Sequence, residues 1–264
     1  MRILVRGEYP YQNAPHWSGI LEGIRELGHE PIPVGPAESA PEHDISIFGS
    51  FYEGSPTCYW FCDYIHKDIS PMNAPVYFTY REHAKRFGGR WLPQASIRRA
   101  EIDRSDPNDK IIFIGQKYPN VEYHDLYTDR QLLIDGTNAE VICGSTKDER
   151  SQVFSRLGNI CGNAGVILGC DGAKHLDFGM SNRVFNVLGA GGFYCTIYTK
   201  GMEDVFENGK HLVWGEDVNS TIKLAKYYQA NQDEAREIAE EGFRYVQSEH
   251  IYSKRIERIL SDVR

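Results

Sequence analysis

The stretch that decides the fold is KIIFIG at residues 110–115, an apolar run that ends at a glycine. Similar short runs lie at residues 140–144 and 165–169, each ending at glycine, and another lies at residues 193–197. Amphipathic stretches with helical spacing separate them. Short apolar runs that alternate with amphipathic stretches are typical of a parallel α/β layer. The second half of the chain is therefore predicted to be one such domain.

The first half of the chain repeats this pattern. A helix is predicted over residues 17–27, because apolar residues recur there at helical spacing and Gly28 follows as a normal C-terminal residue. Strands are predicted at residues 3–5, 31–34, 45–48 and 76–78.

Residues 101–110 are polar and lack apolar periodicity, so they are predicted to link two domains. The predicted domains are residues 1–108 and residues 109–264. The chain from Ser220 onward is helical in pattern, and its terminal helix is expected to pack back on the N-terminal domain. The expected buried contacts of this helical stretch are Ile238, Phe243, Val246, Ile256 and Leu260.

Composition excludes several classes of protein. Hydrophobic residues at 41% and charged residues at 25% exclude a disordered or fibrous chain.

The longest apolar runs are too short to span a membrane, and residues 1–6 form a strand-like segment rather than a signal peptide, so we expect cytoplasmic residence. A net charge of -8 disfavours nucleic acid as a partner, although a local basic groove could still bind it. The cysteines show no CxxC pair and are expected to be buried free thiols rather than disulfides or metal ligands: Cys58, Cys62, Cys143, Cys161, Cys170 and Cys195.

Glycines at the predicted strand ends are candidates for anion binding. Glycine at the carboxyl end of a parallel strand lets backbone N–H groups approach an anion, and the next helix adds a partial positive charge. The candidates are Gly115 with the adjacent Gln116, and Gly144; Gly7 and Gly169 occupy equivalent positions. The alternative is that these glycines only make tight turns. No dinucleotide or P-loop fingerprint is present.

The densest signal is SNRVFNVLGAGGF at residues 181–193. Ser181 is expected to be the N-cap of a helix that carries Asn182 and Arg183 in its first turn. The positive charge of Arg183 in this first turn is unfavourable next to the helix dipole, but its guanidinium group can bind a diphosphate through two hydrogen bonds. The alternative is an ordinary surface arginine.

An ordered series of motifs links this signal to a known family. The series is IFIG at 112–115, RVFNVLGAGGF at 183–193, DVFENGK at 204–210, IAEEG at 238–242 and HIYSKR at 250–255. The chain from residue 110 to residue 255 resembles the C-terminal domain of glycosyltransferases of the spore-maturation protein (CgeB-like) type, which are related to the group-1 glycosyltransferases.

This resemblance implies the GT-B fold, two facing Rossmann-like α/β domains with parallel sheets. It implies a nucleotide-sugar donor bound mainly by the C-terminal domain and an acceptor on the N-terminal side. The expected reaction transfers the sugar from a nucleoside diphosphate to a hydroxyl of a glycan, a small molecule or a modified nucleobase. No tightly bound cofactor or metal is expected, because the helix dipole and basic residues stabilise the diphosphate in such enzymes.

The chain departs from the family pattern at two positions. Asn186 stands where the family has a glutamate expected to bind the ribose hydroxyls, and Phe178 stands where many relatives have an upstream acidic residue. An amide still donates and accepts hydrogen bonds to a diol, but without the assistance of a charge.

In the N-terminal half, residues 7–16 form a loop after the first predicted strand. His16 or Glu8 there is the candidate base for an acceptor hydroxyl. The alternative is a surface loop in which His16 only precedes a helix. Arg81, Glu82 and His83 follow a later strand and are weaker candidates.

Two other functions fit the same residues less well. A nucleotide-sugar epimerase shares the GT-B architecture but needs an acid and base pair that the sequence does not reveal. A catalytically silent nucleotide-sugar-binding module would explain Asn186.

Overall fold

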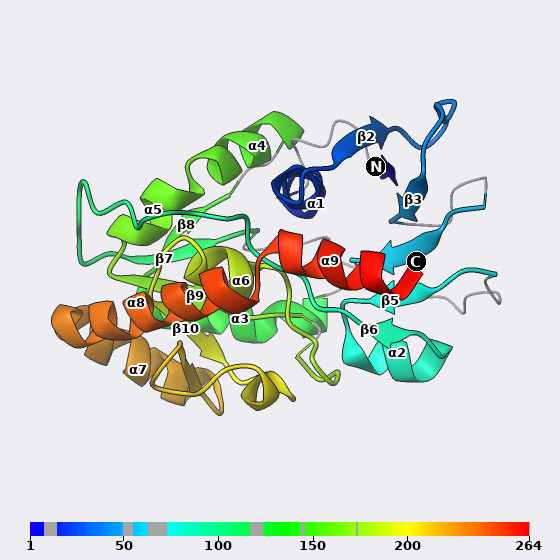
Figure 1. Cartoon of the computed structure of the whole chain (residues 1–264). Helices are drawn as coiled ribbons and strands as arrows, with labels where there is room; N and C mark the ends of the chain where they lie inside the picture. Colours follow the sequence, from blue (N-terminus) through cyan, green and yellow to red (C-terminus); the bar gives the residue numbers. More distant parts are fainter. Residues whose placement is uncertain are drawn as a thin grey trace. The chain divides into compact units, whose positions relative to one another are not determined.

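The computed structural model describes residues 1–7, 15–49, 55–62, 73–116, 124–143, 146–172 and 174–263. The chain forms two compact units, shown with their elements in Figure 1. Unit 1 consists of Met1–Ile97 together with His250–Arg264, and unit 2 is Arg98–Glu249.

Unit 1 contains a six-stranded sheet in the order β2-β1-β3-β4-β5-β6, and the paired strands are parallel. The four strands predicted in this half are confirmed as β1, β2, β3 and β5. β4 and the two-residue β6 were not predicted as strands. The bounds are β1 (Arg2–Arg6), β2 (Glu30–Val34), β3 (Ile45–Phe48), β4 (Cys58–Phe61), β5 (Val76–Phe78) and β6 (Arg90–Trp91).

Two helices far apart in the sequence, α1 (Pro15–Glu26) and α9 (Tyr252–Val263), lie side by side over one face of this sheet (Figure 1). They approach closely because Gly19 and Gly23 of α1 leave no side chain in the path of Tyr252. The terminal helix thus belongs to unit 1. On the opposite face, α2 (Arg81–Phe87) packs against Phe61 and Phe78 through Ala84.

Unit 2 contains a five-stranded parallel sheet in the order β11-β10-β9-β7-β8. The predicted strands are confirmed as β7 (Ile111–Ile114), β8 (Glu140–Ile142), β9 (Val166–Gly169) and β10 (Tyr194–Ile197), and β11 (Val213–Gly215) is an addition. α3 (His124–Thr137), α7 (Val218–Ala230) and α8 (Gln232–Glu249) supply buried side chains to one core of this unit. The remaining helices are α4 (Lys147–Ser155), α5 (Leu157–Asn163) and α6 (Arg183–Leu188).

The chain passes from unit 1 to unit 2 after Ile97, earlier than residue 108, where the sequence placed the boundary. The polar segment expected to be a free linker is instead attached to unit 2. Ile102 packs against Gly191 and Gly162, and Asn163 bonds the backbone of residues 106 and 108. Isolated apolar contacts of this kind leave no periodic signal in a sequence.

All six cysteines are unpaired, and five of them are buried; the expectation of burial was wrong for Cys143, which is exposed. Burial raises the pKa of Cys58 and Cys161 to about 12, so these thiols stay protonated.

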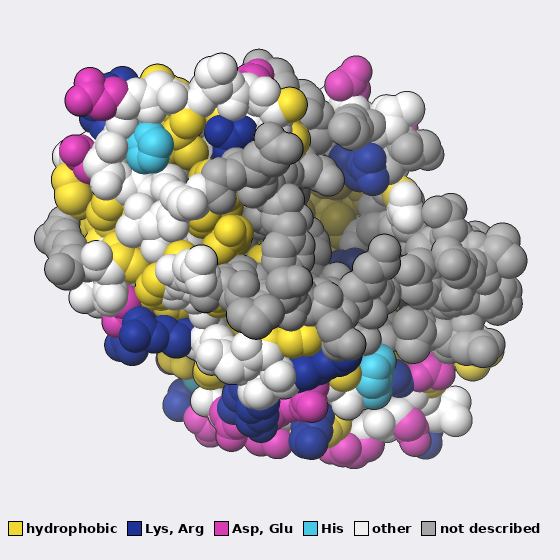
Figure 2. All heavy atoms as spheres, turned by 90° about the vertical axis from the view of Figure 1, so that its right-hand side faces the viewer, with side chains coloured by type: hydrophobic (Ala, Val, Ile, Leu, Met, Phe, Trp, Pro, Cys, Tyr) yellow, Lys and Arg dark blue, Asp and Glu magenta, His cyan; other side chains and the backbone are white. Residues whose placement is uncertain are grey.

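On one face of the molecule, basic and acidic side chains lie intermixed in the described part (Figure 2). None of the described helices is long and apolar enough to cross a membrane.

Candidate functional site

The residues with the most distinctive chemistry in unit 2 gather at one edge of its sheet. Strands β7 and β9 are neighbours, and their carboxyl ends lead into Gly115 and Cys170 respectively. The carboxyl ends of parallel strands share an edge, which is the usual place for a ligand in an open α/β sheet. The start of α6 and the middle of α3 each add an arginine to this edge.

Arg183, the first residue of α6, turns its side chain inward over β7. Its Nε donates to the carbonyl of Ile114 at 2.9 Å, and its guanidinium lies 5.0 Å from the centre of the Phe113 ring. The side chain is only 16% exposed. Arg183 is therefore not an ordinary surface arginine, because a strand-end carbonyl and a buried ring hold its guanidinium.

Asp171 joins this arginine to Ser181. Its Oδ1 accepts a hydrogen bond from the Ser181 hydroxyl at 2.6 Å and lies 3.4 Å from Nη1 of Arg183. The carboxylate is almost fully buried, and a buried carboxylate requires such partners to remain charged. Burial, followed by the charge of Asp171, raises the pKa of the nearby Tyr194 phenol, which stays neutral.

Arg130 of α3 is the second arginine at this edge, and it is 6% exposed. Nε and Nη2 donate to the carbonyl of Cys170 at 3.3 and 2.9 Å, and Nη1 donates to the carbonyl of Gln116 at 3.0 Å. Its guanidinium lies 5.2 Å from the centre of the same Phe113 ring. Arg130 thus joins the loops that follow β7 and β9.

The two guanidiniums and the one carboxylate leave this group with an excess of one positive charge. Backbone carbonyls at the ends of parallel strands are partly negative and would repel an anion. Here the carbonyls of Ile114, Gln116 and Cys170 are bound by the arginines. The edge can therefore attract a diphosphate.

Gly115 has a φ of 139°, a conformation that favours glycine, and an added Cβ would lie 2.9 Å from Nη2 of Arg183. Its N–H, however, donates to the carbonyl of Ile142 at 2.9 Å within the sheet. The amide of Gly115 is therefore occupied, and the glycine matters for the room it leaves beside Arg183. Gln116 is exposed next to it.

Ser181 does not cap α6 as expected, because Asn182 occupies the N-cap position and its side chain makes no capping hydrogen bond. The Ser181 oxygen instead accepts from the N–H of Arg183 at 3.4 Å and donates to Asp171. Asn186 is buried one turn further along the same short helix. Ser181, Asn182, Arg183 and Asn186 thus lie on one continuous segment.

Two candidate residues, Glu8 and Gly144, fall outside the described part of the chain. His16 lies in the first turn of α1 in unit 1, half-buried, with its ring 4.9 Å from that of Trp17. His83, one of the weaker candidates, is buried between the rings of Phe78, Tyr80 and Phe87.

Sequence reasoning missed Arg130, Asp171 and the ring of Phe113. Asp171 follows β9 by two residues, so its position just beyond a strand end was a usable signal. Arg130 lies in the middle of an ordinary helix, and only the tertiary structure reveals its partners.

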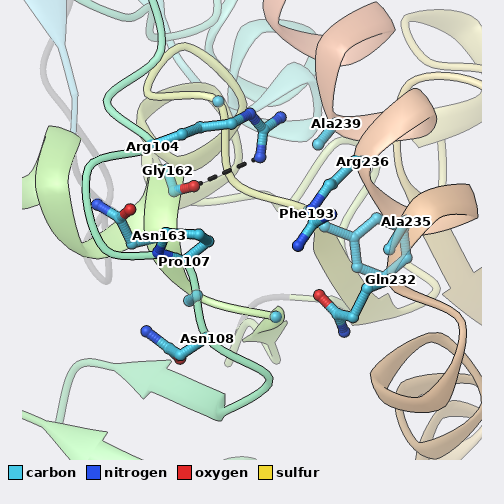
Figure 3. A pocket seen from close by; sticks show the side chains of 13 residues that line it. Arg104, Pro107, Asn108, Gly162, Asn163, Phe193, Gln232, Ala235, Arg236 and Ala239 are labelled. Atoms are coloured by element: carbon cyan, nitrogen blue, oxygen red, sulfur yellow. Dashed lines mark hydrogen bonds between the residues drawn. The ribbon is translucent and has the colours of Figure 1, made fainter.

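A small cavity lies at the opposite edge of the same sheet, beside residues that precede β7, β9 and β10 (Figure 3). Arg104 reaches across it toward the carbonyl of Gly162, and Arg236 and Gln232 of α8 line the other side. Its volume of about 10 Å³ has room for roughly one water molecule. It is too small to hold a nucleotide.

Among the described residues, no group of three or more His, Cys, Asp or Glu side chains is arranged to hold a metal ion.

Residues 139–261 match a protein-family model described as glycosyl transferase-like. The match covers most of unit 2 and α9, which is slightly less than half of the chain. No curated protein matches the sequence.

Several solved structures share the fold over the whole chain. One is AviGT4, a glycosyltransferase involved in avilamycin A biosynthesis, with a TM-score of 0.61, 11% identity, and coverage of 100% of this chain and 97% of that one. Another is an alpha-glucosyltransferase in complex with UDP and a 13-mer DNA containing an HMU base, with a TM-score of 0.63, 10% identity, and coverage of 100% and 99%. A third is Anabaena HepE in complex with UDP and glucose, with a TM-score of 0.60, 10% identity, and coverage of 99% and 100%.

Identities this low establish the fold and leave the chemistry open. The chain has the α/β fold with two parallel sheets that GT-B glycosyltransferases share, which confirms the fold class expected from the sequence.

Proposed function

We propose that this protein is a glycosyltransferase that moves a sugar from a nucleoside diphosphate sugar to a hydroxyl acceptor. The observation that carries the proposal is the pair of buried arginines at the carboxyl edge of the unit 2 sheet, in a chain with the GT-B fold. A buried guanidinium costs free energy unless it is paired, and two of them beside one carboxylate leave positive charge for a ligand.

In this proposal Arg183 binds the diphosphate of the donor. Nε of Arg183 is occupied by a carbonyl, Nη1 lies near Asp171, and the guanidinium also interacts with the Tyr194 phenol. Nη2 lies next to Gly115, and we assign it the contact with a phosphate oxygen. Gln116, Ser181 and Asn182 surround the same position. Asn186 contributes an amide to the sugar or ribose hydroxyls of the nucleotide.

The arrangement suits the chemistry of the leaving group. When the bond between sugar and diphosphate breaks, negative charge builds on the diphosphate, and a prearranged guanidinium stabilises it without reorganising. Helix α6 has only six residues, so its dipole adds little, and the arginine side chains supply the charge.

The acceptor belongs to unit 1 in this proposal, with His16 or Glu8 as the base that takes the hydroxyl proton. Acceptors consistent with the relatives are a glycan, a small molecule or a modified nucleobase, since a structural relative was solved with DNA. We assign the chain, within glycosyltransferases, to the spore-maturation type on its ordered motifs. We infer cytoplasmic residence from six unpaired cysteines, which an oxidising compartment would tend to pair.

Incubation of the protein with a panel of sugar-labelled nucleotide donors and mixed hydroxyl acceptors tests the proposal. Transfer, or slow donor hydrolysis without acceptor, is the expected result. An isomerised donor would identify an epimerase, and binding without turnover would identify a silent module. The control is Arg236→Ala, which removes an exposed arginine from the same unit and should leave turnover unchanged.

A further inference from the structure

Arg130 lies outside every motif that the sequence singled out, yet it makes the largest set of side-chain contacts to strand-end carbonyls at this edge. The helix α3 that carries it packs on the sheet through Leu133 and Ile134. These contacts fix where the guanidinium lies, between the loops that follow β7 and β9.

The hydrogen bonds of Arg130 join the backbone just after β7 to the backbone just after β9. One loop begins at Gly115 and the other at Cys170, and the strands before them are paired neighbours in the sheet. Nε and Nη2 hold the Cys170 carbonyl and Nη1 holds the Gln116 carbonyl. The planar guanidinium therefore holds the Gln116 and Cys170 carbonyls at a fixed spacing.

Each loop continues directly into a residue of the proposed donor site. Cys170 precedes Asp171, which holds Ser181 and lies beside Arg183. Gly115 lies against Nη2 of Arg183. The guanidiniums of Arg130 and Arg183 also both lie over the ring of Phe113, so the two arginines share one buried support.

We propose that Arg130 is a positioning residue for the diphosphate of the donor, an inference that rests on the proposed function. It acts by holding the loops after β7 and β9 so that Arg183, Asp171 and the backbone around Gln116 keep the geometry that an anion needs. Three of its five guanidinium N–H groups donate to the carbonyls of Gln116 and Cys170, and we assign it a role through these two backbone positions.

A merely structural arginine would affect stability and leave ligand affinity unchanged. Arg255 of α9 offers the matched control, because it is also buried and also donates to two backbone carbonyls, those of Pro93 and Gln94, but in unit 1. Replacement of either arginine by alanine removes hydrogen bonds to two buried or partly buried backbone carbonyls. Only Arg130 faces the loops of the proposed site.

The experiment measures the Kd of a nucleoside diphosphate, the donor KM and kcat, and the melting temperature for wild type, Arg130→Ala, Arg130→Lys and Arg255→Ala. Arg130→Ala is expected to weaken nucleotide binding roughly tenfold or more, the scale of the charge-assisted contact between Arg183 and phosphate that it holds in place. The donor KM should rise more than kcat falls. Arg255→Ala should melt lower as well but bind nucleotide as wild type does.

Arg130→Lys keeps the charge but cannot hold both carbonyls with a planar fork, so it should fold and still bind weakly. Guanidinium ion at low millimolar concentration should partly restore nucleotide binding to Arg130→Ala, and ammonium ion should not. If Arg130→Ala fails to fold, the nucleotide Kd of Arg130→Lys tests the inference.

Nucleotide affinity in folded Arg130→Lys and Arg130→Ala equal to that of wild type would overturn the inference, as would an equal loss of affinity in Arg255→Ala. Wild type that neither binds any nucleoside diphosphate nor turns over any donor would instead overturn the proposed function itself.

Discussion

Replacement of Arg183 by alanine should lower both the stability of the protein and its affinity for nucleotide, by amounts that can be measured separately. The side chain donates to the Ile114 carbonyl and lies over the buried ring of Phe113. In the proposed function it also binds the donor diphosphate. Each of these contacts contributes a free energy, to folding or to nucleotide binding, whose typical size is known.

The stability cost comes from the contacts within the protein. Loss of the charged donor to a largely buried carbonyl costs about 1.5 to 3 kcal/mol, and loss of the contact with the ring costs about 1 kcal/mol. Relief of the unfavourable charge at the start of α6 returns little, because the dipole of a six-residue helix is weak. The net loss of about 2.5 to 4 kcal/mol should lower the melting temperature by several degrees, at roughly 2 to 4 °C per kcal/mol for a domain of this size.

The binding cost comes from the phosphate contact. A charge-assisted contact to phosphate contributes about 1.5 to 3 kcal/mol, which corresponds to a loss of roughly ten- to a hundredfold in Kd. The assay is calorimetric titration with a nucleoside diphosphate well below the melting temperature of the variant, so that the protein stays folded. Arg236→Ala serves as the control, because it removes an exposed arginine with a neighbouring acidic partner.

The reasoning is refuted if Arg183→Ala melts several degrees lower than wild type yet binds the nucleotide equally well. Arg183 would then be a structural residue, and the phosphate would have to bind elsewhere.

Three further predictions concern other features. Gly115→Ala should weaken nucleotide binding with intact secondary structure, because the residue has a φ of 139° and the new Cβ would displace Nη2 of Arg183; parallel titration and circular dichroism check this. Burial, followed by the charge of Lys210, holds the pKa of His211 below its ordinary 6.5, and its Nδ1 accepts the N–H of Glu207. The folded state therefore binds this proton less tightly than the unfolded state, so the stability of the protein should fall as the pH drops below about 6.5. Melting temperatures measured between about pH 7.5 and about pH 5 should fall less in His211→Gln than in wild type. His16→Ala should lower turnover by roughly a hundredfold or more while nucleotide affinity stays unchanged, if His16 is the base; equal turnover in variant and wild type would assign the role to another group.

Much of the fold could be predicted from short-range patterns in the sequence. The apolar runs at residues 111–114 and 166–169 are strands because both faces of a parallel sheet are buried, which makes such strands uniformly apolar. β6 escaped prediction because a two-residue edge strand has no pattern. The boundary after Ile97 escaped prediction because Ile102 and the hydrogen bonds of Asn163, which leave no periodic pattern, attach the polar segment to unit 2.

The candidate site could be predicted only where its chemistry lies in a contiguous motif. Residues 181–186 were found because a cap-like serine, an arginine and an asparagine follow each other closely. The orientation of the Arg183 side chain could not be predicted, because it depends on the carbonyl of Ile114 at the end of strand β7. Arg130 could not be found for the same reason, because both of its carbonyl partners come from loops far away in the sequence.

The most direct test of the central claim is a crystal structure of the protein with a bound nucleoside diphosphate. The account predicts that the diphosphate lies at the carboxyl edge of the unit 2 sheet, within hydrogen-bond distance of the Arg183 guanidinium and close to Gly115 and Asn186, with Arg130 still bound to the Gln116 and Cys170 carbonyls. A nucleotide that binds elsewhere, with Arg183 still directed only at Ile114 and Asp171, would contradict it.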